Sequence, residues 1–197
     1  LIADEVITAY GRTGSWSGSR HWGVQPDFAV TATAITNGYF PFGAVMIADH
    51  VAEVFEADES GKGAVFSGYT YSGQPVGAAA AVAGLREMER LQIPDNAAAR
   101  GAQLMAGLEQ LKIKHAIVGD VRGGEGLMNA LELVSDPAAK TPLGPERIKA
   151  VFEATYAQGV MVRVSGANMI LSPPLILTEA DVSHILAALD TGLAAGA

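Results

Sequence analysis

Short apolar runs bounded by glycine and proline characterise the first fifty residues. These runs predict strands at Leu1 to Ala3 and at Phe28 to Ala32, separated by a glycine-rich loop from Gly11 to Gly23. A turn follows at Asn37-Gly38. Because polar residues do not alternate with the apolar ones, these runs are typical of strands buried on both faces of a parallel or mixed sheet.

Helical spacing replaces these runs in the middle of the chain. The pattern predicts a helix from Asp49 to Glu56, and a longer one that Pro75 opens and that ends near Leu91. Pro94 interrupts this pattern, and a further helix is predicted from there to about Lys112.

The last third of the chain has shorter elements. It predicts strands at Ile117 to Val121, Leu127 to Val134, Val160 to Val164 and Met169 to Leu171, a helix from Pro145 to Ala157, and a last helix with Thr178 as N-cap. We therefore predict a domain boundary at this change of pattern. Residues 1–112 form part of a larger α/β domain, and residues 113–197 form a small α+β domain.

Composition excludes several classes of protein. The chain has 197 residues, of which 49% are hydrophobic, so it can bury a core. Its net charge of -8 disfavours nucleic acid and anionic membranes as partners, because both require clustered lysine and arginine. Without cysteine it has no disulfide and no thiolate metal site, which fits a cytoplasmic protein. The four histidines have no metal-ligand spacing, and no apolar run is long enough to span a bilayer.

Two adjacent carboxylates, Asp4 and Glu5, end the first predicted strand. In open α/β sheets ligands bind beyond the carboxyl ends of the strands, so an acid at this point is well placed for chemistry. The alternative is a solvated strand end or a helix cap, because acids are common where strands meet loops.

An ordered set of motifs follows this acidic pair. It comprises Gly11-Arg12-Thr13-Gly14, Pro26-Asp27, the run from Asn37 to Val45, the run from Phe66 to Val76, Val121-Arg122-Gly123 with Gly126-Leu127-Met128, and the run from Arg163 to Glu179. Together these motifs closely resemble the class III aminotransferases over nearly the whole chain. The resemblance implies a fold-type-I, pyridoxal-phosphate-dependent transferase: the later part of its large domain, followed by its small C-terminal domain. The chain then corresponds to the C-terminal part of such an enzyme.

The resemblance assigns roles to three residues near the first two strands. Asp4 would pair with the pyridine nitrogen of pyridoxal phosphate, and Val6 would pack against one face of the ring, a role compatible with that of an ordinary core valine. The Schiff-base lysine of the family falls at Thr33. A threonine hydroxyl forms no imine and is a poor base at neutral pH, so this position departs from the family pattern.

Two further residues match functional positions of the family. Thr70 corresponds to a threonine that reaches the cofactor phosphate of the other subunit of a homodimer; otherwise it is a loop threonine making a local turn bond. Arg163 corresponds to an arginine that binds the carboxylate of the keto acid; otherwise it is a solvated arginine on a surface strand.

The resemblance implies transfer of an amino group from an amine or ω-amino acid to pyruvate or a similar keto acid, with pyridoxal 5'-phosphate as cofactor. Thr33 leaves a second hypothesis open: a non-catalytic cofactor-binding or structural chain, either a lysine knockout or a pseudoenzyme subunit.

Overall fold

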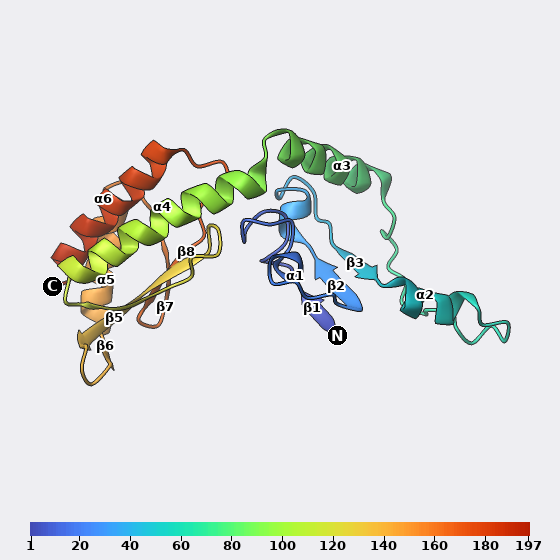
Figure 1. Cartoon of the computed structure of the whole chain (residues 1–197), viewed down its shortest axis with the longest axis horizontal. Coiled ribbons are helices and arrows are strands. Elements are labelled where there is room, and N and C mark those ends of the chain that lie inside the picture. The colour runs from blue at the N-terminus through green and yellow to red at the C-terminus, as the bar shows by residue number, and fades with distance from the viewer. The chain divides into compact units, whose positions relative to one another are not determined.

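The computed structural model describes residues 1–197, which form two compact units (Figure 1). Unit 1 contains Leu1–Gly11 and Ser15–Ile93, and unit 2 contains Arg12–Gly14 and Pro94–Ala197. The division therefore lies at Ile93 and Pro94, earlier than the predicted boundary at Lys112. None of the helices combines the length and the apolar character that a membrane span requires.

Unit 1 is built on a three-stranded sheet with the order β1 (Ile2–Asp4), β2 (Phe28–Thr31) and β3 (Ala44–Ile47). β1 runs parallel to β2, and β3 runs antiparallel to it, so the sheet is mixed, as predicted. The predicted burial on both faces is wrong for the first strand, because Leu1 is 65% exposed and Ile2 is 68% exposed. Without covering layers, these strands keep apolar side chains in solvent.

The helices of unit 1 are short except for the last. They are α1 (Gly18–His21), the 3-10 turn η1 (Thr33–Ile35), α2 (Asp49–Glu56) and α3 (Pro75–Arg90). At the start of α3 the side chain of Gln74 accepts a hydrogen bond from the backbone N–H of Gly77 (2.8 Å), and Pro75 occupies the first turn, where its missing N–H costs nothing. The sequence predicted α2 and α3 but not α1, η1 or β3.

Unit 2 packs three helices with an antiparallel sheet. The helices are α4 (Ile93–Lys114), α5 (Pro145–Ala157) and α6 (Glu179–Ala195). The strand order is β4 (Val118–Arg122), β5 (Asn129–Asp136), β8 (Asn168–Leu171) and β7 (Arg163–Ser165), and β6 (Thr141–Pro142) pairs with β5. Figure 1 shows α4 and α6 running side by side along this sheet.

The core of unit 2 explains why α4 belongs to it. Leu104, Leu108 and Leu111 follow one another at helical spacing on α4 and are all buried. They join Leu131 of β5 and Leu189 of α6 in a single hydrophobic cluster. The apolar face of α4 thus packs with the elements that follow it, which moves the boundary between the units ahead of this helix.

The Gly123–Gly126 loop lies between β4 and β5. Gly123, Gly124 and Gly126 all have positive φ angles, which favour glycine. The carbonyl of Arg12 accepts from the backbone N–H of Leu127 (3.0 Å), and the Arg12 guanidinium donates to the carbonyl of Leu127 (2.9 Å). Residues 12–14 are thereby held within unit 2.

The predicted strand from Val160 to Val164 is largely wrong, because pairing begins only at Arg163, opposite Ile170. Before that point Val162 is buried, whereas Met161 is 77% exposed. The segment is apolar enough to resemble a strand, yet it pairs with no neighbouring strand.

Candidate functional site

The exit of β1 brings Asp4 and Val6 together. Asp4 is the last residue of β1 and pairs in register with Val30 of β2. Its Oδ1 accepts a hydrogen bond from the backbone N–H of Val6 (3.1 Å), and its side chain is exposed. The other carboxylate oxygen makes no hydrogen bond, so Asp4 can accept one from a ligand beyond the strand end.

Thr33 lies beside the same turn. It begins η1, and its hydroxyl donates to the carbonyl of Val6 (3.0 Å). Its φ of 41° is in the left-handed region, which a β-branched residue adopts only under strain. Asp4, Val6 and Thr33 therefore form one group, although 27 residues separate Val6 from Thr33.

No lysine is hydrogen-bonded to this group in unit 1. Its single lysine, Lys62, lies in the loop after α2, where its backbone N–H donates to Ser60 Oγ (3.3 Å). The residues present fit a cofactor that needs an anionic partner for a ring N–H and an apolar wall, which Asp4 and Val6 supply. They do not fit covalent attachment through an imine, because Thr33 has no amine.

Glu5 differs completely from its neighbour Asp4, because it is buried, with 3% exposure. Its carboxylate accepts from the backbone N–H groups of Gly18 (2.8 Å) and Ser19 (2.6 Å), and from the hydroxyls of Thr8 and Ser19. Burial alone would raise the pKa of Glu5, but these hydrogen bonds outweigh it and hold the pKa below its ordinary value. The sequence pattern gave no means of separating the roles of the two acids.

Thr70 lies in a turn at the end of the loop that joins α2 to α3. The turn is closed by a hydrogen bond from the N–H of Ser72 to the carbonyl of Tyr69 (2.9 Å), while the Thr70 side chain is exposed and makes no hydrogen bond. Phe66 and Tyr71 are 94% and 85% exposed. No hydrogen bond joins Thr70 to the group around Asp4, so the structure does not unite these candidates.

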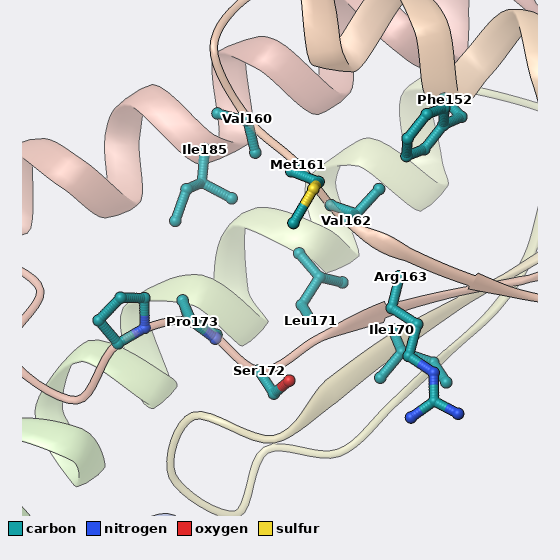
Figure 2. A pocket seen from close by; sticks show the side chains of 11 residues that line it. Phe152, Val160, Met161, Val162, Arg163, Ile170, Leu171, Ser172, Pro173 and Ile185 are labelled. Carbon is teal, nitrogen blue, oxygen red and sulfur yellow. The ribbon is translucent and has the colours of Figure 1, made fainter. Parts of the chain in front are cut away.

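Arg163 lies in unit 2, at the rim of an apolar cavity of about 510 Å³ (Figure 2). The cavity walls include Phe152, Val160, Met161 and Ile185. The guanidinium of Arg163 is exposed, has no hydrogen-bond or ion-pair partner, and extends past Ile170 in Figure 2. It is therefore free to bind an anion.

Arg122 provides the contrasting case in the same sheet. The strand register places Arg122, Ala130, Ile170 and Arg163 in one row across four strands. The Arg122 guanidinium donates to Glu132, to Asp120 (3.3 Å) and to Asn168. Of the two arginines in this row, Arg122 makes three hydrogen bonds and Arg163 makes none.

These features, in a chain with the motif order described above, agree with comparison to known proteins. Residues 1–193 match the family described as Aminotransferase class-III. The chain belongs to this family. One relative is an uncharacterized aminotransferase of Sinorhizobium fredii, which is 42% identical to the chain. The match covers 95% of the chain and 41% of the relative. The taurine–pyruvate aminotransferase of Bilophila wadsworthia is 36% identical over 96% of the chain and 43% of its own length.

Solved structures confirm the predicted fold class. An amine transaminase from an uncultivated Pseudomonas species, in its PLP-bound form, matches with a TM-score of 0.94 and 43% identity, covering 98% of this chain and 44% of that one. An (S)-enantioselective omega-transaminase from Thermomicrobium roseum matches with a TM-score of 0.89 and 38% identity, and the match covers 98% of this chain and 43% of that one. The class III chain thus has the α/β fold of these transaminases and spans less than half of their length.

Proposed function

We propose that this chain is part of an aminotransferase that moves an amino group from an amine or ω-amino acid to pyruvate or a similar keto acid, with pyridoxal phosphate as cofactor. We further propose that Thr33 impairs this activity. The observation that carries the proposal is the group formed by Asp4, Val6 and Thr33 in a class III chain. Residues 1–112 then belong to the large cofactor-binding domain, and residues 113–197, which make up most of unit 2, form the small C-terminal domain.

Asp4 and Val6 are assigned the binding of the cofactor ring. The free oxygen of Asp4 would accept a hydrogen bond from the N–H of the ring nitrogen, and the carboxylate would stabilise the positive charge of the ring. Val6 offers a half-buried apolar surface for one face of the ring. When bound, pyridoxal phosphate supplies the electron sink that stabilises negative charge at the substrate carbon.

Thr33 limits what the site can do. The proton that leaves the substrate carbon needs a base, and a hydroxyl that donates to the carbonyl of Val6 is a poor one. Substrate and cofactor can be held in place, but neither a covalent link to the protein nor an effective proton carrier is present at this position.

The variant Thr33→Lys tests this proposal in the protein supplied with cofactor. A positioned base accelerates proton transfer by about two to four orders of magnitude, so we expect alanine formation from pyruvate to rise at least about a hundredfold. Thr33→Val is the matched control: it keeps the branched shape but loses the hydroxyl, and it should give no gain. Equal rates in the lysine and threonine proteins would contradict the proposal.

Arg163 is assigned the carboxylate of the keto acid, because its guanidinium is unpaired and offers a bidentate fork. In the Thr33→Lys background, Arg163→Ala should slow the keto-acid half-reaction by about two decades, or roughly 2–3 kcal/mol, and the simple-amine half-reaction much less. Arg122→Ala is the control in the same row of the sheet, and it should not produce this difference between the half-reactions. Equal losses in both half-reactions for Arg163→Ala would remove Arg163 from the role.

Thr70 is assigned the cofactor phosphate of a second subunit in a homodimer. Its exposed hydroxyl and the exposed aromatic residues Phe66 and Tyr71 support a position at an interface. Thr70→Ala should weaken phosphate-dependent cofactor binding without changing the sedimentation coefficient of the dimer. Weakened binding in a protein that sediments as a monomer would argue against a shared site.

The second hypothesis is a non-catalytic cofactor-binding or structural chain, and Thr33 together with the absence of another lysine near it favours this reading. The absorption spectrum separates the two. In the Thr33 protein, dialysis should remove the cofactor colour, whereas Thr33→Lys should retain it. If Thr33→Lys retains the colour but forms no alanine, the chain is a binding module.

A further inference from the structure

Glu5 makes more hydrogen bonds than any other group around the exit of β1. Its backbone N–H donates to the carbonyl of Val30 in β2 (2.8 Å), and its carbonyl accepts from the N–H of Ala9 (3.0 Å). Its Oε2 accepts from Gly18 N and the Thr8 hydroxyl, and its Oε1 accepts from the N–H and hydroxyl of Ser19. Every polar atom of this residue is therefore bonded.

The backbone of α1 packs closely against this carboxylate, so that only glycine fits at position 18. A Cβ atom built on Gly18 would lie 3.1 Å from Oε2 of Glu5 and 2.9 Å from the ring of Trp22. Such distances are tighter than ordinary contacts. A side chain at position 18 would therefore press on the carboxylate. The carboxylate makes no ion pair, so its position is held by its four hydrogen-bond donors.

Together these bonds join Glu5 to three parts of unit 1. Val30 belongs to β2, Gly18 and Ser19 belong to the start of α1, and Thr8 belongs to the loop between β1 and α1. Glu5 also stands between Asp4 and Val6, whose side-chain-to-backbone hydrogen bond defines the turn beyond β1. A residue fixed at both its backbone and its side chain restricts the turn on either side of it.

We propose that Glu5 is a positioning residue, whose carboxylate fastens the start of α1 to the end of β1 and thereby holds the Asp4–Val6 turn in the geometry that presents Asp4 to the cofactor ring. This role rests on the proposed function only in its last step, the presentation to the cofactor. The fastening and its effect on Asp4 concern residues of this chain alone.

The variant Glu5→Gln is a sharp test, because glutamine has nearly the same shape as glutamate. Each carboxylate oxygen accepts one backbone N–H, from Gly18 or from Ser19. Whichever way the amide turns, its NH₂ group faces one of these donors, and a backbone N–H cannot become an acceptor. The variant therefore breaks one of the two backbone hydrogen bonds, weakens the fastening and leaves the volume nearly unchanged. Ser19→Ala, which removes one hydroxyl only, is a milder variant should Glu5→Gln not fold.

Hydrogen exchange and NMR measure the fastening and its effect. In Glu5→Gln the amides of Gly18, Ser19 and Val6 should exchange at least about tenfold faster, and the carboxyl resonance of Asp4 should move. Ser19→Ala should shift the same signals less. Asp4→Asn should leave Gly18 and Ser19 protected, and Glu53→Gln, on the exposed face of α2, should change none of these signals.

Unchanged exchange at Gly18 and Ser19 would show that no fastening exists. Faster exchange at those two amides, with the Val6 amide and the Asp4 resonance unchanged, would reduce Glu5 to a structural residue and overturn the proposal. Titration with pyridoxal phosphate completes the test: both Glu5→Gln and Asp4→Asn should weaken binding about tenfold. If the unaltered protein binds no pyridoxal phosphate, the proposed function fails, while the exchange data still decide whether Glu5 positions Asp4.

Discussion

Unit 1 and unit 2 differ in how they bury apolar side chains. All members of the main hydrophobic cluster come from unit 2, where three helices and an antiparallel sheet enclose Leu104, Leu131 and Leu189. Unit 1 has a three-stranded sheet with exposed apolar side chains, including Ile2 and Val45. Unit 2 is thus organised by packing, whereas unit 1 depends more on hydrogen bonds, such as those of Glu5 and Thr33.

This contrast shows where chemistry and stability lie in the chain. The candidate cofactor residues Asp4, Val6 and Thr33 belong to the unit that contributes nothing to the main hydrophobic cluster, and Arg163 lies on the surface of the unit that forms it. We therefore expect unit 2 to be most sensitive to substitutions that crowd its core, and unit 1 to be most sensitive to substitutions that remove a hydrogen bond.

The largest effect should come from crowding the core of unit 2. A Cβ atom on Gly101, in the middle of α4, would overlap the carbonyl of Gly126. Backbone cannot yield as a flexible side chain does, so Gly101→Ala should lower the unfolding free energy by about 3 kcal/mol or more. Gly68→Ala in unit 1 is the control, because nothing lies within 4 Å of its Cβ position. Thermal unfolding of both variants measures the difference, and equal midpoints would show that α4 can move away from the Gly123–Gly126 loop.

A smaller effect, dependent on pH, should follow the loss of the Glu5 carboxylate. The pKa of Glu5 is lowered in the folded protein, so its contribution is complete above the ordinary glutamate pKa of about 4.3 and is lost as the pH falls through the folded value. At pH 7, Glu5→Gln should be less stable than the unaltered protein by about 2 kcal/mol, and this difference should shrink in acid.

Asp190 in unit 2 serves as the comparison for this titration. Its hydrogen bonds with Lys114 (2.6 Å) and with His115 (2.6 Å) also lower its pKa, but the carboxylate is 34% exposed. Solvent screens such a pair, so Asp190→Asn should cost less than about 1 kcal/mol at pH 7. If the two variants lost equal stability, burial of Glu5 would not be what distinguishes the two acids.

Exposed apolar residues should also make unit 1 the site of self-association. Replacing both Ile2 and Val45 with threonine keeps strand-forming side chains but removes apolar surface, and should raise the dissociation constant of the assembly about tenfold, or about 1.4 kcal/mol. Ile113→Thr in α4 of unit 2 is the control, since Ile113 is 78% exposed. Sedimentation at several concentrations would reveal the change. A larger effect from Ile113→Thr would move the association surface to unit 2.

The fold was predictable where its signals are local. Pro145 opens α5, and Thr178 and Asp181 form a capping box at the start of α6, so the sequence located both helices. Pairing between distant strands was harder to predict. β3 exists because Ala44–Ile47 aligns with β2, and β7 begins only where Arg163 meets Ile170. The sequence of neither segment indicates which strand it pairs with.

The candidate site was predictable mainly through family resemblance. Motif order placed Asp4, Val6 and Thr33 in one site, and the structure brings these three together through the backbone of Val6. The left-handed backbone at Thr33 was not predictable, because β-branched residues rarely adopt it. The environment of Glu5 was also hidden, since its donors Gly18 and Ser19 lie 13 and 14 residues further along the chain.

Two buried threonines, one in each unit, give the smallest and finest comparison. Thr31 in unit 1 is 2% exposed, and its hydroxyl accepts from the Tyr10 hydroxyl (3.0 Å) and donates to the carbonyl of Ala44 (3.3 Å). Thr13 in unit 2 is 1% exposed, and its hydroxyl has no hydrogen-bond partner.

Valine matches the shape of threonine, so replacing threonine with valine tests the hydroxyl alone. Thr31→Val should cost about 1 kcal/mol, because it leaves Tyr10 unpaired, whereas Thr13→Val should change the unfolding free energy by less than about 1 kcal/mol, toward greater stability. Urea unfolding of both variants would measure this difference, and a clear loss of stability in Thr13→Val would mean that a buried water bonds to its hydroxyl.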